Sequence, residues 1–122
     1  MGINHSKVKS FSFAFAGVKE AFKKEPNLRI HFSIAILALI FAFFLKFTVI
    51  EWVILFITIF FVLTLELINT SLESVVNLVS PEIKDEAKIA KDVSAAAVLF
   101  ASIMSIVVGI ALFVPKIMRL LL

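Results

Sequence analysis

Three long apolar stretches constrain what this chain can fold into more than any other feature. The last is the clearest, because the segment from Val93 to Pro115 contains no Asp, Glu, Lys or Arg. A helix needs about 20 apolar residues to cross roughly 30 Å of hydrocarbon. Hydrophobic residues make up 61% of the 122-residue chain, and the mean hydropathy is +1.10. We therefore expect an all-α integral membrane protein.

The chain is too short for a separate soluble catalytic domain beside its spans. We interpret residues 1–122 as a single membrane domain in which any chemistry takes place at or in the bilayer. Pro115 stands where the third span is expected to end. The predicted segments are a surface helix over 6–25, spans over 29–47, 50–80 and 93–115, and a cytoplasmic loop over 82–92.

The N-terminal segment has the pattern of an amphipathic helix at the membrane surface. Phe11, Phe15, Val18 and Phe22 recur at helical spacing and form one apolar stripe. Such a helix lies in the headgroup plane, and Pro26 is expected to end it. The pattern leaves two roles open, a simple anchor or a cover over a lipid-binding groove.

The basic residues are distributed unequally about the three spans. Nine precede the first span or lie between the second and third, and three lie on the other side. This bias predicts that the N-terminus and the 82–92 loop are cytoplasmic, where nucleotides are available. The net charge of +3 comes from residues that flank apolar runs, so it indicates a membrane surface and gives no support for a nucleic-acid partner.

Two carboxylates inside the second apolar stretch are the chain's most unusual feature. On a helix, Asn69, Thr70, Glu73 and Asn77 fall within roughly 60° of Glu66, so they form one polar stripe. A buried carboxylate without a partner costs several kcal/mol, so membrane carboxylates usually have a function. Glu66 is expected about 10 Å deeper in the membrane than Glu73.

This separation suits two tasks in one reaction. A shallow carboxylate can hold Mg²⁺ on a polyphosphate, and a deeper one can accept a proton from a lipid hydroxyl. Three alternatives remain open from the residues alone. Glu66, Asn69 and Glu73 can be hydrogen-bonding contacts between helices, the relay of a small cation-coupled transporter, or parts of a structural adaptor.

The charged segment after the second span favours phosphate chemistry. Lys84, Lys88 and Lys91 recur at helical spacing beside the carboxylate stripe. Their alternative role is that of topology-setting lysines in a solvated turn. The sequence contains neither GxxxxGK[ST] nor GxGxxG, so any nucleotide site is not a soluble-type phosphate loop. It has no Cys, and His31 is interpreted as an interfacial residue.

These residues together resemble the prokaryotic diacylglycerol kinase family. The resemblance lies in the block Glu66-Leu67-Ile68-Asn69-Thr70-Ser71-Leu72-Glu73, in the downstream Lys91-Asp92 before an Ala-rich span, and in Glu25 with Arg29. It covers nearly the whole chain. It implies a homotrimeric kinase of the bacterial inner membrane, with three spans and a surface helix per subunit, active sites shared between subunits, ATP as phosphoryl donor and Mg²⁺ as cofactor.

The resemblance also implies roles for individual residues. Glu66 would be the general base for the lipid hydroxyl, with Asn69 organising the site, and Glu25 and Glu73 would hold Mg²⁺. The remaining assignments are ATP contacts at Glu25, Glu73, Glu82, Ile83, Lys84, Lys91 and Asp92, and lipid contacts at Glu66, Lys19, Arg29 and Ala95.

Two positions depart from the family pattern, Asn77 where Asp is usual and Ala95 where some members carry Ser. The segments Ile50-Glu51-Trp52 and Phe113-Val114-Pro115-Lys116 resemble the Gram-positive type, which implies undecaprenol kinase activity. Diacylglycerol phosphorylation, which would give phosphatidic acid, is the alternative.

Overall fold

The computed structural model describes residues 6–82 and 84–122 and is all-helical across them. Four helices follow in the order α1 (Lys7–Lys24), α2 (Pro26–Phe44), α3 (Val49–Val79) and α4 (Asp85–Leu121). The last three are each long and apolar enough to cross a membrane. The expectation of an all-helical fold is confirmed across the described residues, and three of the helices could span a membrane, as expected.

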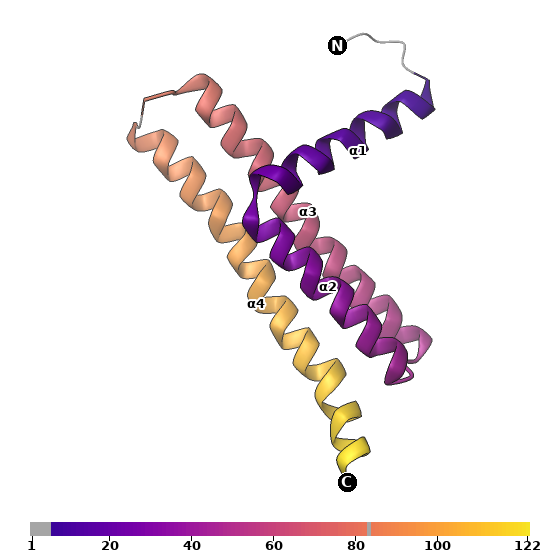
Figure 1. Ribbon diagram of the computed structural model, residues 1–122. Helices are drawn as coiled ribbons and strands as arrows, with labels where there is room; N and C mark the ends of the chain where they lie inside the picture. The colour runs from indigo at the N-terminus through magenta and orange to yellow at the C-terminus, as the bar shows by residue number, and fades with distance from the viewer. Residues whose placement is uncertain (1–5, 83) are drawn as a thin grey trace.

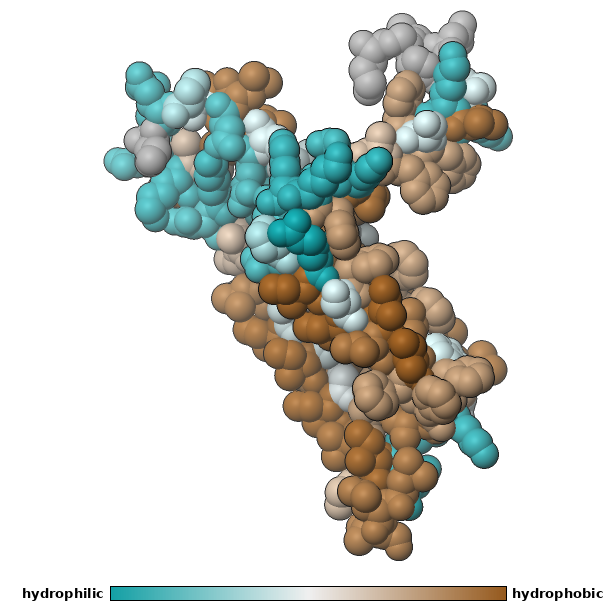
Figure 2. Space-filling model, in the orientation of Figure 1, coloured by the Kyte–Doolittle hydropathy of each residue, from teal (hydrophilic) through white to brown (hydrophobic). Residues whose placement is uncertain are grey.

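The three long helices lie side by side, and α1 projects from the start of α2, below the turn that joins α3 and α4 (Figure 1). α3 packs most extensively against α4 and less against α2, while α1 packs against α2 and touches α3. Figure 2 shows hydrophilic residues gathered at the end that carries α1 and the α3–α4 turn, with an apolar surface along the bundle. The molecule therefore has one strongly polar end.

The break between α1 and α2 follows the sequence closely. Ser6 caps α1 by accepting a hydrogen bond from the Lys9 amide, and Pro26 occupies the first turn of α2. Proline suits that position because the first-turn N–H groups of a helix have no partner within the helix. Arg29 joins the two helices, because its guanidinium donates to the carbonyl oxygens of Phe22 and Lys23 at 3.4 and 3.3 Å.

The opposite end of the bundle is closed by an aromatic and ionic cluster. Phe47, in the α2–α3 turn, packs against Trp52 and Phe113. Lys116 forms an ion pair with Glu51 at 3.1 Å. This contact fixes the C-terminal half of α4 against the α2–α3 turn.

The fourth helix differs from the sequence prediction at both ends. It begins at Asp85, so most of the predicted 82–92 loop is its first two turns, where Asp85 and Glu86 interact favourably with the helix dipole. It also continues through Pro115 to Leu121, so the expected end at Pro115 is wrong. A proline removes one backbone hydrogen bond, which membrane helices tolerate, and Lys116 anchors the following turn.

Candidate functional site

The polar side chains of α3 form three levels along one side of the helix, each in contact with a different part of the chain. The buried residues of α3 follow helical spacing, and Glu66, Asn69 and Thr70 are among them. Glu73 is half-buried, and Asn77, nearest the polar end, is exposed. We call these the deep, middle and outer levels, centred on Glu66, Glu73 and Asn77.

The deep level holds the most buried charged side chain of the described residues. Glu66 is only 2% exposed, and its Oε1 lies 3.8 Å from Nε2 of His31 on α2. That oxygen receives no hydrogen bond from any residue that the structure describes. The Thr70 hydroxyl donates to the backbone carbonyl oxygen of Glu66 at 2.9 Å and not to its carboxyl group. A buried carboxyl oxygen that no donor occupies is available to accept a proton from a substrate.

The middle level brings together two carboxyl groups that are distant in the sequence. Glu25, in the short break between α1 and α2, lies close enough to Glu73 of α3 for the two carboxyl groups to interact. Burial raises the pKa of Glu25, the neighbouring charge and hydrogen bond of Glu73 raise it further, and Lys24 opposes the shift. Asn69 lies on the same turn, and its Nδ2 donates to Glu73 Oε1 at 3.5 Å.

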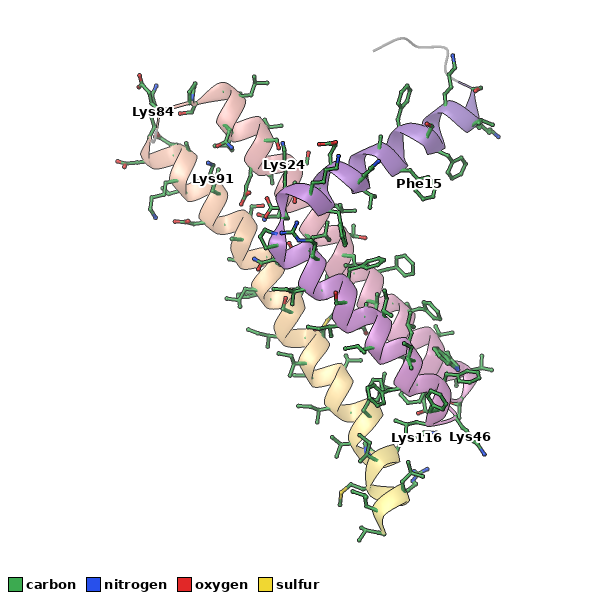
Figure 3. The ribbon with its side chains drawn as sticks, in the orientation of Figure 1. Phe15, Lys24, Lys46, Lys84, Lys91 and Lys116 are labelled. Carbon is green, nitrogen blue, oxygen red and sulfur yellow. The ribbon has the colours of Figure 1, made fainter. Side chains whose placement is uncertain are left out.

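The outer level connects α3 to α4. The Lys91 ammonium group donates a hydrogen bond to Oδ1 of Asn77, and Figure 3 shows the Lys91 side chain between the two helices. Because Asn77 is neutral, it positions the lysine and leaves its positive charge uncompensated. The sequence had left the contribution of Asn77 open, and the structure shows that it holds Lys91.

The other predicted site residues lie outside the three levels or outside the described residues. Asp92 forms an exposed ion pair with Lys88 at 2.6 Å, and Arg29 is engaged with the end of α1. Ala95 is exposed, whereas its neighbour Ser94 is the buried residue of that turn. Ile83 lies outside the described residues. Glu82, Lys84 and Lys19 are exposed, the first two in the α3–α4 turn and the third on α1.

His31 is the residue that the sequence analysis missed. It was interpreted as interfacial, yet its imidazole lies against the buried Glu66. It also lines a largely apolar cavity of about 340 Å³ between α2, α3 and α4. An ionisable side chain within an apolar span is itself a signal of function, and that signal was present at position 31.

Comparison with known proteins identifies the family of this chain. Residues 12–113 match the sequence profile of the prokaryotic diacylglycerol kinase family. The chain belongs to this family. It is 37% identical to the undecaprenol kinase of Bacillus subtilis over 108 residues, which cover 88% of each chain.

Two further relatives are named diacylglycerol kinases. The protein from Synechocystis is 42% identical over 113 residues, which cover 92% of this chain and 65% of the relative. The protein from Haemophilus influenzae is 34% identical over 113 residues, which cover 92% of this chain and 95% of the relative.

Membership of the prokaryotic diacylglycerol kinase family makes the chain a lipid kinase, which confirms the predicted enzyme class. The transporter and the structural adaptor are thereby set aside. The three apolar helices place this kinase in a membrane.

The middle level fits the cofactor of a kinase. Among the described residues, no group of three or more His, Cys, Asp or Glu side chains is arranged to hold a metal ion alone. Mg²⁺ does not require such a group, because it binds through one or two carboxylates and completes its shell with phosphate oxygens and water. Glu25 and Glu73 supply two neighbouring carboxyl groups whose charges interact, and a divalent cation would relieve their repulsion.

Proposed function

We propose that the protein catalyses the ATP- and Mg²⁺-dependent phosphorylation of undecaprenol to undecaprenyl phosphate. The observation that carries the kinase mechanism is the order of the three levels on α3. A buried carboxyl group, a carboxylate pair and a lysine follow one another toward the polar end of the bundle. This order matches a lipid hydroxyl arriving from the bilayer and a nucleotide arriving from water.

The proposed reaction divides the work between the levels. Glu66 accepts the proton of the lipid hydroxyl as its oxygen bonds to the γ-phosphorus and the bond to the β-phosphate oxygen breaks. Glu25 and Glu73 would hold Mg²⁺, which would neutralise charge on the phosphates. Asn69 orients Glu73, and Lys91 contacts the phosphates. Positioning and electrostatic stabilisation supply most of the catalysis in phosphoryl transfer.

The remaining predicted contacts lie at the edges of this site. Glu82, Ile83, Lys84 and Asp92 would lie toward the nucleotide at the polar end of the bundle. Lys19, Arg29 and Ala95 would border the lipid. The contact of Arg29 with the end of α1 gives it a way to set the angle of that helix over the lipid.

We also propose that the polar end is cytoplasmic, in the inner membrane of a bacterium. The excess of Lys and Arg at that end supports this orientation. The surface-helix assignment of α1 is supported by its large exposed apolar residues, which include Phe11 and Phe15. A protease added to right-side-out vesicles should leave α1 intact, and its cleavage would contradict the orientation.

A homotrimer with active sites shared between subunits is part of the proposal. The small residues of α4 permit close contact between neighbouring helices, and Ala95, Ala96 and Ala97 are exposed in the single chain. Light scattering of the detergent-solubilised protein should give the mass of three chains. A mass of one chain would contradict shared sites.

Undecaprenol is favoured over diacylglycerol by the Gram-positive features of the sequence and by the undecaprenol kinase that this chain matches over 88% of both lengths. The test is phosphate transfer from γ-labelled ATP in mixed micelles with Mg²⁺, with each lipid offered separately. More label in undecaprenyl phosphate than in phosphatidate is expected. The reverse result would make the protein a diacylglycerol kinase, as the other two relatives are named.

Replacing Lys91 with Met should raise the KM for ATP by about 10-fold, because one charge-assisted contact contributes about 1.5 kcal/mol. The KM for the lipid should not change, because Lys91 lies at the outer level. Initial rates at varied ATP and at varied lipid separate the two effects. Lys9→Met, at an exposed position of α1, is the control for loss of one positive charge. Equal KM values for ATP in both variants would remove Lys91 from the nucleotide site.

A further inference from the structure

His31 lies beside Glu66, the residue proposed as the base. The two residues come from different helices, α2 and α3, and their Nε2 and Oε1 atoms are 3.8 Å apart. The side chain of Glu66 is 3% exposed, whereas that of His31 is 24% exposed. His31 is therefore the more accessible of the two side chains.

A base at the position of Glu66 needs a path for the proton it accepts. Each transfer leaves one proton on a carboxyl group that water scarcely reaches, and the next transfer requires the carboxylate again. His31 is the titratable side chain within ion-pair distance of Glu66 in the described structure. Histidine ordinarily gains and loses a proton between roughly pH 5 and 8, which suits a proton shuttle.

We propose that His31 removes the proton from Glu66 after each phosphoryl transfer and releases it to water. This inference rests on the proposed function, in which Glu66 is the base. The O–H bond of the Glu66 carboxyl group breaks, its electron pair stays on the carboxylate, and the proton bonds to the neutral Nε2 of His31. The imidazolium then gives the proton to water, so both side chains return to their starting forms.

The geometry distinguishes this role from a structural hydrogen bond. At 3.8 Å the two atoms are beyond hydrogen-bond distance, and no other donor among residues 6–82 and 84–122 bonds to Glu66 Oε1. The contact therefore does not hold the helices together as a direct hydrogen bond would. A small side-chain movement, or one water molecule, would complete the transfer, and the cavity of about 340 Å³ that His31 lines gives the imidazole room to move.

The charges around the pair are compatible with a shuttle. Besides His31, the charged groups that act on Glu66 are Glu25, at the α1–α2 break, and Glu73 of α3. Both are acidic, so His31 is the one basic group among the charged groups that act on Glu66. The polar residues that α4 contributes to the cavity are Ser102 and Ser105. Their hydroxyl groups do not titrate in the range of histidine, roughly pH 5 to 8.

The test is the pH dependence of kcat for phosphate transfer in the full-length enzyme, with the better acceptor of undecaprenol and diacylglycerol. His31→Ala and His31→Gln should lower kcat about 10- to 100-fold, as loss of a group that supports a reacting residue does. They should leave the KM for the lipid unchanged and remove the acid-side inflection of the kcat profile. Added imidazole should restore kcat in His31→Ala, because the enlarged cavity has room for it.

Ser33→Ala is the matched control, because Ser33 lies on the same helix and donates to the Arg29 carbonyl oxygen. If Glu66→Gln has lost its activity, two results would overturn the role of His31 and leave Glu66 as the base. One is a wild-type kcat profile in His31→Ala. The other is a reduced kcat with an unchanged inflection and no rescue by imidazole. Full turnover by Glu66→Gln would overturn the assignment of the base, and with it the shuttle.

Discussion

Replacement of Glu66 with Gln lowers kcat for phosphate transfer by about 10²- to 10⁴-fold, the usual contribution of a general base. The amide keeps the shape of the carboxyl group and loses its ability to accept the lipid proton. Because Glu66 Oε1 receives no hydrogen bond in the folded protein, the variant should fold normally. The KM for the lipid should therefore stay close to that of the wild type.

Labelled phosphate transfer at saturating ATP and lipid measures this effect, and a thermal melt in the same micelles checks the fold. Thr58→Val is the matched control, because Thr58 is also a buried polar residue of α3, and its hydroxyl bonds to its own helix at Ile54. Near-normal turnover by a folded Glu66→Gln variant would show that another group accepts the proton.

Replacement of either Glu25 or Glu73 with Gln raises the Mg²⁺ concentration needed for half-maximal activity by about 10- to 100-fold. Each variant loses one of two carboxylates that a single cation would share. The double variant should therefore need little more Mg²⁺ for half-maximal activity than either single variant. Such non-additivity is expected of two residues that act on one ion. Chelation of Mg²⁺ by EDTA should abolish activity in the wild type.

Magnesium titrations of the initial rate, at fixed concentrations of ATP and lipid, measure these shifts. Glu20→Gln is the control for the loss of one negative charge near α1, because Glu20 is exposed and pairs with Lys23 at 3.6 Å. An unchanged Mg²⁺ requirement in both single variants would place the metal elsewhere. Additive effects of the two substitutions would show that Glu25 and Glu73 act on separate steps.

Much of the candidate site could be predicted because it lies on one helix. The spacing of Glu66, Asn69, Glu73 and Asn77 places them on one side of α3 through the 3.6-residue period alone. A second local rule, that proline interrupts a helix, predicted that α1 ends before Pro26, which the structure confirms. The partners of these side chains come from other helices, and a period within one helix carries no information about its neighbours.

The residues predicted to contact the lipid also show that sequence spacing does not reveal contacts between helices. Ala95 and Ser94 are adjacent in the sequence, and only the packing of α4 against α3 decides that Ser94 is buried and Ala95 exposed. Arg29 was expected to border the lipid, but its described hydrogen bonds go to the end of α1. A long basic side chain has several acceptors within reach, and tertiary geometry selects among them.

The sequence by itself determined the membrane, the number of spans and the polar stripe of α3, because hydropathy and helical period are local properties of the chain. Only the tertiary structure decided that His31 faces Glu66, that Glu25 meets Glu73, and that Asn77 holds Lys91. It also decided that α4 continues through Pro115, where Lys116 pairs with Glu51 on another helix. These pairings depend on the relative depth and rotation of packed helices, which follow from side-chain packing over their whole length.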